Sequence, residues 1–228
     1  VALLGESGCA ICDMLVHASL IDGCKGSNIE FFKHNDMASL EMVLKRTQPK
    51  YKNRIVVVDG VYSMDGDIAP VPKIVRLKKQ YGCFLLVDEA HSACVIGQTG
   101  GGVDEYFGLA PDDVDIKMGT LSKGLGTCGG YLAGRACLIE YLRYNLPGFV
   151  FSVGLSPALA AGTLAAVRLL RKEPQIMANM RRNIQCFADT ARRHRMDICL
   201  AGETAIIPVL IGRDEDAFAL SNEMRRRG

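Results

Sequence analysis

Apolar runs that end in a polar side chain alternate along this chain with segments whose apolar residues recur at helical spacing. The runs predict strands at residues 55–59, 84–87, 115–119 and 129–133, and the alternating residues 9–12 predict a further short strand. Helical spacing predicts helices at residues 70–81, 138–144, 157–170 and 174–195. Buried strands separated by helices are typical of an α/β fold whose mostly parallel sheet is covered by helices on both faces.

A second strand–helix unit follows near the C-terminus. Residues 205–211 read as a strand, and a helix should follow, with acids at 214–216 and arginines at 225–227 where they suit the helix dipole. One strand and one helix cannot bury a core of their own. We therefore expect residues 1–172 to form a large domain, and residues 173–228 a connecting helix and the beginning of a smaller, incomplete α+β domain.

Composition narrows the functional classes. The 228 residues are 49% hydrophobic and carry 27 Lys and Arg against 25 Asp and Glu, so the charge of +2 gives no reason to expect nucleic acid or an anionic membrane. No apolar run approaches the roughly 20 residues that span a bilayer, and no secretory signal begins the chain, so we expect a cytoplasmic location.

The nine cysteines are expected to be reduced thiols. Cys9 and Cys12 form a C-x-x-C, which can mark a redox pair or half of a zinc site. No second pair follows at ligand spacing, and the segment reads as a strand. The pattern favours core packing, and no metal site is predicted.

An acid and an imidazole follow the apolar run at residues 84–87. Asp88 comes directly after the run, His91 lies three residues later, and the carboxyl ends of strands face the ligand crevice in open α/β sheets. A carboxylate there can keep a pyridinium nitrogen protonated, and the imidazole can hydrogen-bond a ring oxygen or carry protons. A helix cap with a surface histidine explains this segment equally well.

A second candidate lies in GTLSKGLG, residues 119–126. Hydroxyls at Thr120 and Ser122 and flexible glycines can bind phosphate, and the amine of Lys123 can attack an aldehyde. The alternative is a solvated loop lysine. The glycine-rich GQTGGG at residues 97–102 lacks the ending of a P-loop and is better explained as a flexible loop at the rim.

Seven motifs together resemble the α-oxoamine synthase family of fold-type I pyridoxal 5'-phosphate (PLP) enzymes. Their order and spacing agree over nearly the whole chain, which is far more specific than any one motif. The motifs are HASLIDG (17–23), FKHND (32–36), YSMDGDIAP (62–70), LLVDEAHS (85–92), GTLSKGLG (119–126), GGYLAG (129–134) and PGFVFSVGLSP (147–157).

The resemblance implies PLP as the cofactor and assigns residues around its ring. Lys123 would carry the cofactor as a Schiff base and act in catalysis, and Asp88 would pair with the pyridine nitrogen. His91 would lie near the ring oxygen and take part in catalysis, and His17 would stack on the ring face. Ser63 would contribute near the ring oxygen or the substrate.

The resemblance also assigns the phosphate. Thr120 and Ser122 would contact it, and Ser152 would reach the phosphate of the cofactor in a neighbouring subunit, which requires a homodimer with shared active sites. Family members also have sequence before and after the matched stretch, so the resemblance implies that this chain is a fragment.

The implied reaction is the decarboxylative condensation of an amino acid with an acyl thioester, carried by CoA or by acyl carrier protein, to give an α-aminoketone. Another fold-type I activity, an aminotransferase or a lyase, shares the Asp and the Lys but not the HASLIDG and YSMDG patterns. A non-catalytic subunit related to the family is a further alternative, although such subunits lose the lysine that Lys123 matches.

Overall fold

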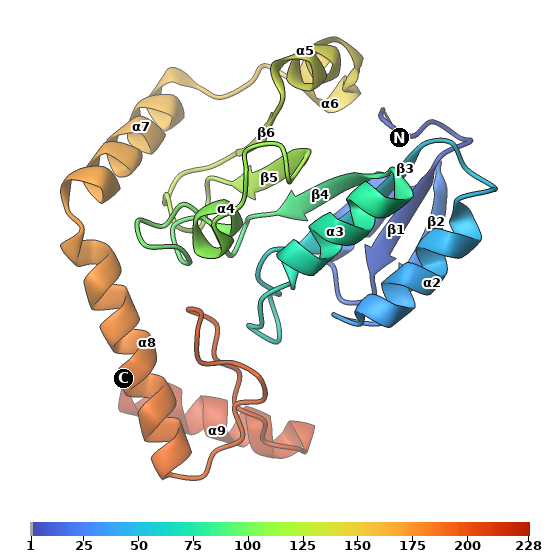
Figure 1. Cartoon of the computed structure of the whole chain (residues 1–228). Coiled ribbons are helices and arrows are strands. Elements are labelled where there is room, and N and C mark those ends of the chain that lie inside the picture. Colours follow the sequence, from blue (N-terminus) through green and yellow to red (C-terminus); the bar gives the residue numbers. More distant parts are fainter. Residues whose placement is uncertain (1) are drawn as a thin grey trace.

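The computed structural model describes residues 2–228 and contains one six-stranded sheet (Figure 1). In spatial order its strands are β2 (Asn28–Phe32), β1 (Cys9–Asp13), β3 (Arg54–Asp59), β4 (Phe84–Asp88), β5 (Ile116–Thr120) and β6 (Gly130–Gly134). The first five are parallel, and β6 pairs antiparallel with β5 at the edge. The predicted α/β fold and all five strands predicted within the large domain are confirmed.

The helices are α1 (Ala18–Cys24), α2 (Met37–Thr47), α3 (Val71–Tyr81), α4 (Val103–Phe107), α5 (Ala136–Asn145), α6 (Pro147–Val150), α7 (Pro157–Lys172), α8 (Gln175–Arg193) and α9 (Asp214–Arg227). Helices α2 and α3 lie side by side on one face of the sheet, while α7 and α8 form an arm that extends away from it (Figure 1). The predicted helices correspond to α3, α5, α7, α8 and α9.

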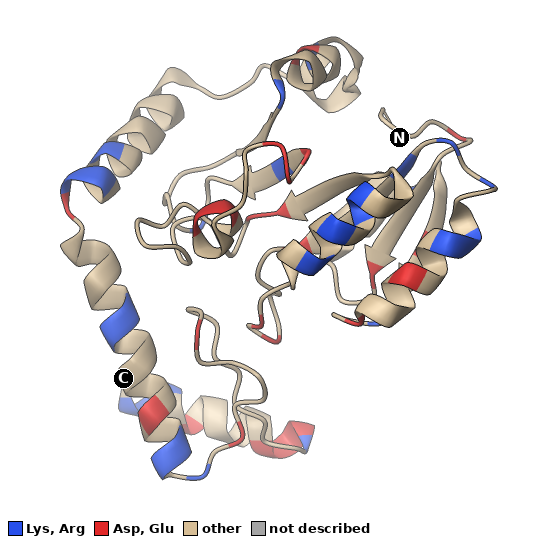
Figure 2. Cartoon of the chain, viewed as in Figure 1, with Lys and Arg blue, Asp and Glu red and all other residues tan. Residues whose placement is uncertain are grey.

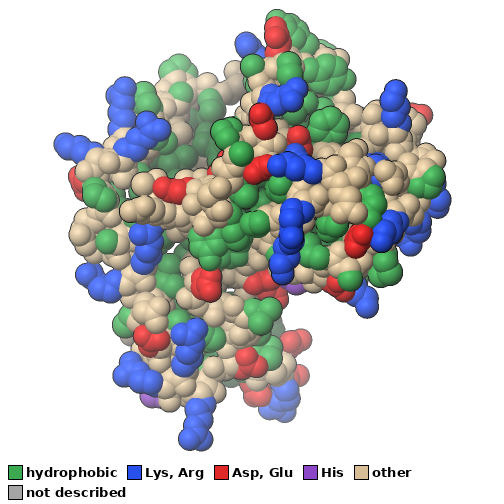
Figure 3. Space-filling view, viewed as in Figure 1, with side chains coloured by type: hydrophobic (Ala, Val, Ile, Leu, Met, Phe, Trp, Pro, Cys, Tyr) green, Lys and Arg blue, Asp and Glu red, His purple; other side chains and the backbone are tan. Residues whose placement is uncertain are grey.

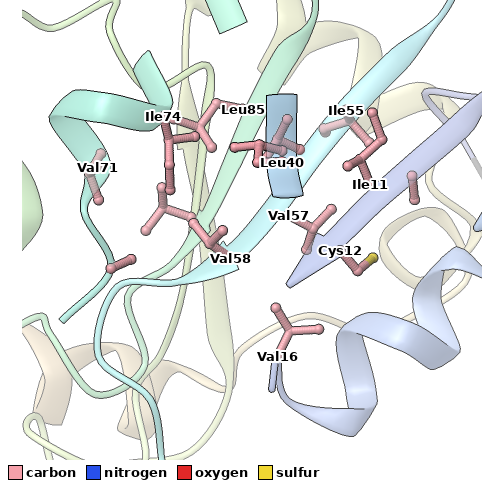
Figure 4. Packing of buried hydrophobic residues seen from close by; sticks show 14 of the residues in the cluster. Ile11, Cys12, Val16, Leu40, Ile55, Val57, Val58, Val71, Ile74 and Leu85 are labelled. Atoms are coloured by element: carbon pink, nitrogen blue, oxygen red, sulfur yellow. The ribbon is translucent and has the colours of Figure 1, made fainter. Parts of the chain in front are cut away.

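The core lies between the strands of the sheet and the helices packed on it. Every residue of β1 and β3 is buried, and Leu40 of α2 and Ile74 of α3 are fully buried against them (Figure 4). Cys9 and Cys12 are both fully buried in β1, which confirms that they pack in the core. Figure 2 shows strands almost without charge along their length and acidic side chains at the tips of β1 and β4.

The start of α2 depends on one capping carboxylate. Asp36 Oδ1 accepts the backbone N–H groups of Ala38 at 2.9 Å and Ser39 at 3.0 Å, which have no partner inside the helix. We expect Asp36→Ala to lower the free energy of unfolding by about 1 kcal/mol in urea denaturation. Asp36→Asn should retain most of this stability, and an equal loss in both variants would contradict capping by the side-chain oxygen.

The strand predicted at residues 205–211 is wrong. Only Leu210 in this segment makes a bridge, to Asp197, and Pro208 interrupts the run. Proline has no N–H to donate to a ladder, so an apolar run that contains it is a poor central strand. Ile207 and Val209 instead pack beside a small cluster that includes residues of α8. The domain boundary at residue 172 stays a prediction.

Apolar side chains are unusually exposed beyond β6. None of the residues of α7 is buried, and Phe151 and Val153, between α6 and α7, are 87% and 105% exposed. Hydrophobic side chains also gather over α5 and α6 at the top of Figure 3. Among residues 2–228, no helix combines the length and hydrophobicity needed to cross a membrane. Exposed apolar patches of this kind often mark protein contacts.

Candidate active site

Side chains at the carboxyl ends of β3, β4 and β5 line one cavity, as expected for an open α/β sheet. The cavity has a volume of about 410 Å³. Its walls are formed by His17, Ser19, Asp59, Val61, Asp88, Ala90, His91, Met118, Gly119, Thr120, Lys123, Gly129 and Gly130. Five of the eight residues predicted for the site, His17, Asp88, His91, Thr120 and Lys123, therefore meet in one place.

Asp88 is the last residue of β4 and is only 5% exposed. Its Oδ1 accepts the backbone N–H of Ala90 at 2.8 Å. Burial raises the pKa of the Asp88 carboxyl, although that hydrogen bond and the charges of Lys123 and His17 act in the opposite direction. A buried carboxylate is stabilised by a nearby positive charge, so Asp88 is suited to a cationic group in the cavity.

Lys123 and His91 reach the cavity from two different loops. The Nζ atom of Lys123 lies 2.5 Å from Nε2 of His91. Burial, together with the charges of Lys123 and His17, lowers the pKa of His91. The imidazole is therefore neutral at physiological pH, and its Nε2 can accept a hydrogen bond from Nζ of Lys123. Lys123 is exposed and bonded to His91 at the cavity wall, so its role as the cofactor lysine stays a prediction beside that of a solvated loop lysine.

Asp59 is a cavity residue to which the sequence analysis gave no role, although it ends a predicted strand. It pairs in register with Asp88, is 3% exposed, and accepts the backbone N–H of His17 through Oδ1 at 3.3 Å. Burial and the neighbouring charge of Asp88 raise the pKa of Asp59 to about 7. Its position at the end of the strand predicted at residues 55–59 indicates a place at the ligand crevice, but the sequence gives no role for it.

This raised pKa predicts that the free energy of unfolding of the cofactor-free protein depends on pH. Between about pH 4 and 7 the folded state retains a proton on Asp59 that the unfolded chain releases, so stability falls as pH rises through this window. Asp59→Asn removes the penalty and still accepts from His17. We expect it to raise the free energy of unfolding by up to about 4 kcal/mol at pH 8 and hardly at pH 4.

Urea denaturation at both pH values checks this result. Asp112→Asn, at an exposed position, controls for the loss of one negative charge. An equal change at pH 4 and pH 8 would contradict the proposed protonation of Asp59.

The other end of the cavity is built from hydroxyls and glycines. Thr120 Oγ1 lies 2.8 Å from Ser122 Oγ and accepts the backbone N–H of Ser122 at 3.3 Å. A Cβ on Gly119 would lie 2.5 Å from the ring of Tyr131, and a Cβ on Gly130 would lie 2.9 Å from the carbonyl oxygen of Gly119. Only glycine fits at both positions, which lets β5 and β6 pack closely beside the hydroxyls.

Two predicted site residues lie outside the cavity wall. Ser63 lies in a turn that begins just after Val61, a wall residue. Ser152 lines a separate, more apolar groove of about 760 Å³, and its Oγ donates to the carbonyl of Phe149 at 3.3 Å. The groove adjoins the cavity through Met118 and three glycines. Ser122 touches Thr120 but is not itself a wall residue.

The chain belongs to the aminotransferase class I and II family, because the model of that family matches residues 2–228. The 8-amino-7-oxononanoate synthase of Symbiobacterium thermophilum is 41% identical over 228 residues, which cover 99% of this chain and 58% of that protein. 8-Amino-7-oxononanoate synthase 1 of Bacillus velezensis is 42% identical over 230 residues, with coverage of 100% and 58%. The chain thus spans somewhat more than half the length of these curated relatives.

Solved structures give the same classification. The serine palmitoyltransferase of Sphingomonas wittichii superposes with a TM-score of 0.90 at 34% identity, covering 96% of this chain and 55% of that one. A serine palmitoyltransferase from S. paucimobilis, solved with a bound PLP–myriocin aldimine, gives 0.88 at 32%, with coverage of 94% and 56%. The fold-type I architecture and the resemblance to α-oxoamine synthases are confirmed.

Proposed function

We propose that this chain forms the cofactor-binding part of a PLP-dependent α-oxoamine synthase, an acyltransferase similar to 8-amino-7-oxononanoate synthase and serine palmitoyltransferase. The enzyme condenses an amino acid with an acyl thioester of CoA or acyl carrier protein, with loss of CO₂ and the thiol, to give an α-aminoketone. The observation that carries the proposal is the convergence of Asp88, His91 and Lys123 on one cavity from separate segments.

The cavity fits PLP at the three polar points of that molecule. The buried carboxylate of Asp88 suits a protonated ring nitrogen, and the amine of Lys123 is the nucleophile for an aldehyde. The hydroxyls of Thr120 and Ser122, beside Gly119 and Gly130, suit a phosphate. His17, at the start of α1, is a cavity wall residue and suits a stacking role.

Within this arrangement each residue has a defined task. Asp88 favours the proton on the ring nitrogen, and the bound cofactor then supplies an electron sink for negative charge at the substrate Cα. Lys123 Nζ would take the Cα proton, and the neutral imidazole of His91, whose Nε2 lies 2.5 Å away, would orient that amine by a hydrogen bond. When its ring proton is on Nε2, His91 would donate a hydrogen bond to the developing oxyanion of the thioester carbonyl. We further propose that Ser63 contacts the ring oxygen or the substrate.

The proposal includes a homodimer in a cytoplasmic setting. Ser152 lies in an apolar groove that adjoins the cavity, beside the exposed side chains of Phe151 and Val153 and near helix α7, none of whose residues is buried. A second copy seated over this region would bury the patch and carry Ser152 to the phosphate of its partner. Size measurement by light scattering tests the dimer.

Mass spectrometry of products tests the activity directly. The full-length protein is incubated with PLP, a panel of amino acids and a panel of acyl thioesters, and the expected product is an α-aminoketone formed together with CO₂. Lys123→Ala serves as the control. Amino-group transfer to a keto acid, without acyl transfer, would identify an aminotransferase, and elimination products would identify a lyase. A protein that binds no PLP would be a non-catalytic subunit.

A further inference from the structure

His34 lies outside the cavity wall, and its ring joins two carboxylates from distant parts of the chain. Nδ1 lies 2.9 Å from Oδ1 of Asp13, and Nε2 lies 2.9 Å from Oδ2 of Asp67. An ionised carboxylate only accepts hydrogen bonds, so a ring that bonds one on each side must donate from both nitrogens. With both carboxylates ionised, this geometry is that of the doubly protonated imidazolium form of His34.

The surroundings of His34 stabilise this charge. Asp13 is fully buried at the end of β1, and the fully buried ring of Tyr62 meets the imidazole edge-on at 4.4 Å. Burial alone would lower the pKa of His34, but the hydrogen bonds and charges of Asp13 and Asp67 outweigh it and hold the pKa above its usual value. The charge of Asp59, at the end of β3, acts on the neighbouring Tyr62 hydroxyl.

Asp13 and Asp67 are each hydrogen-bonded to a segment that carries a predicted site residue. Asp13 also accepts the backbone N–H of Leu15 at 2.9 Å, two residues before His17 of the cavity wall. Asp67 closes the turn that holds Ser63, because the backbone N–H of Tyr62 donates to the carbonyl oxygen of Asp67 at 3.0 Å. His34 therefore ties the segment that positions His17 to the turn that positions Ser63.

Asn35 reinforces the same bridge. Its backbone N–H donates to Asp13 Oδ2 at 2.9 Å, and its side-chain Nδ2 donates to Asp67 Oδ2 at 2.6 Å. Asn35 adopts φ +51°, a left-handed conformation that asparagine tolerates better than most residues. His34 and Asn35, which are adjacent in one tight loop, therefore both hydrogen-bond to the two carboxylates.

We propose that His34 is a positioning residue of the enzyme, which fixes His17 and Ser63 relative to each other by bridging Asp13 and Asp67 as an imidazolium ion. The assignment of His17 and Ser63 to the cofactor and substrate rests on the proposed function. Loss of the proton would leave one carboxylate without its donor and expose two neighbouring acids to mutual repulsion.

The first test needs no cofactor. Long-range ¹H–¹⁵N NMR spectra of the cofactor-free, full-length protein report the protonation of each histidine nitrogen. At about pH 7.5, where an ordinary imidazole is mostly neutral, we expect His34 to be protonated on both nitrogens. Asp67→Asn should move its titration to lower pH. A neutral, single-tautomer His34 at this pH would overturn the proposal.

The second test measures cofactor binding and turnover in His34→Gln, which keeps hydrogen-bonding capacity but cannot become cationic. We expect PLP affinity to fall about tenfold and kcat about 10- to 100-fold, since misplacement of active-site groups by about 1 Å can cost on the order of 100-fold. His194→Gln, at an exposed histidine after α8, is the matched control.

The pH dependence separates positioning from a general loss of stability. Because the proton leaves His34 as pH rises through its raised pKa, PLP affinity in the wild type and in His194→Gln should decline at a higher pH than that at which an ordinary imidazole titrates. The PLP affinity of His34→Gln should not show this decline with rising pH. The same decline in that variant would overturn the proposal. If His34→Gln does not fold, Asp67→Asn takes its place, with the decline shifted to lower pH.

Failure of the proposed function gives a different outcome. A wild-type protein that binds PLP but forms no aminoketone would refute the synthase activity, while the NMR and PLP titrations would still decide the role of His34.

Discussion

Replacing Lys123 with alanine is expected to abolish covalent attachment of PLP and to reduce turnover by at least about 100- to 10,000-fold, the range typical for loss of a general acid–base group. The side chain has two tasks, as nucleophile toward the aldehyde and as carrier of the Cα proton. Lys123 is the only amine in the described cavity wall, so no other residue there can replace it beside His91. Visible absorbance of the bound cofactor and product formation are the measurements.

Borohydride reduction sharpens this result. In the wild type it should fix the cofactor on the peptide that contains Lys123, as located by mass spectrometry. Lys123→Arg keeps the positive charge, but its guanidinium does not lose a proton at neutral pH and cannot form a Schiff base. We therefore expect it to lose activity as Lys123→Ala does. Lys52→Ala, at an exposed lysine, should behave as the wild type. Unchanged labelling and turnover in Lys123→Ala would exclude the assigned role.

Replacing Asp88 with asparagine is expected to leave PLP bound but to lower kcat on the order of 100- to 1,000-fold, as for removal of one electrostatic contact in an active site. Asparagine preserves the shape and can still accept from Ala90, so the fold should be unaffected. What disappears is the negative charge that keeps the ring nitrogen protonated. Steady-state kinetics and PLP titration separate the effects on turnover and binding.

A methylated cofactor provides the control for this variant. PLP that carries a methyl group on the ring nitrogen has a fixed positive charge and no longer depends on a carboxylate for protonation. It should restore a substantial part of the activity of Asp88→Asn. Full activity of Asp88→Asn with ordinary PLP would contradict the assignment, and Asp59→Asn/Asp88→Asn would then show whether Asp59 substitutes for it.

Most of the sheet could be predicted because its strands are continuous apolar runs. Every residue of β3 is buried, β4 is buried at three of its five positions, and each strand ends in an aspartate at the edge where the cavity lies. Strand β2 escaped prediction because its sequence, NIEFF, mixes exposed and buried positions at the edge of the sheet. The false strand at residues 205–211 shows the converse, since an apolar run forms a strand only where a partner can pair with it.

The same limit applies to the site. The motifs identified Asp88, Lys123 and His91 as candidates, and the end of its predicted strand placed Asp59 at the same crevice, but neither a role for Asp59 nor the bridge made by His34 was predicted. Both roles depend on residues brought close by β-strand pairing: Asp59 lies opposite Asp88 in the register of β3 and β4, and Asp13 lies at the end of β1. Spacing along the chain carries no direct sign of such contacts.

The sequence alone determined the class of fold and the chemistry on offer, because apolar periodicity and reactive residue types are local properties of the chain. The tertiary structure decided which groups meet. It brought Lys123 within 2.5 Å of His91, enclosed His34 between two carboxylates, and left Ser152 in a neighbouring groove. Distances and burial, which set the pKa of Asp59 and of His91, arise only when strands pair and loops pack over them.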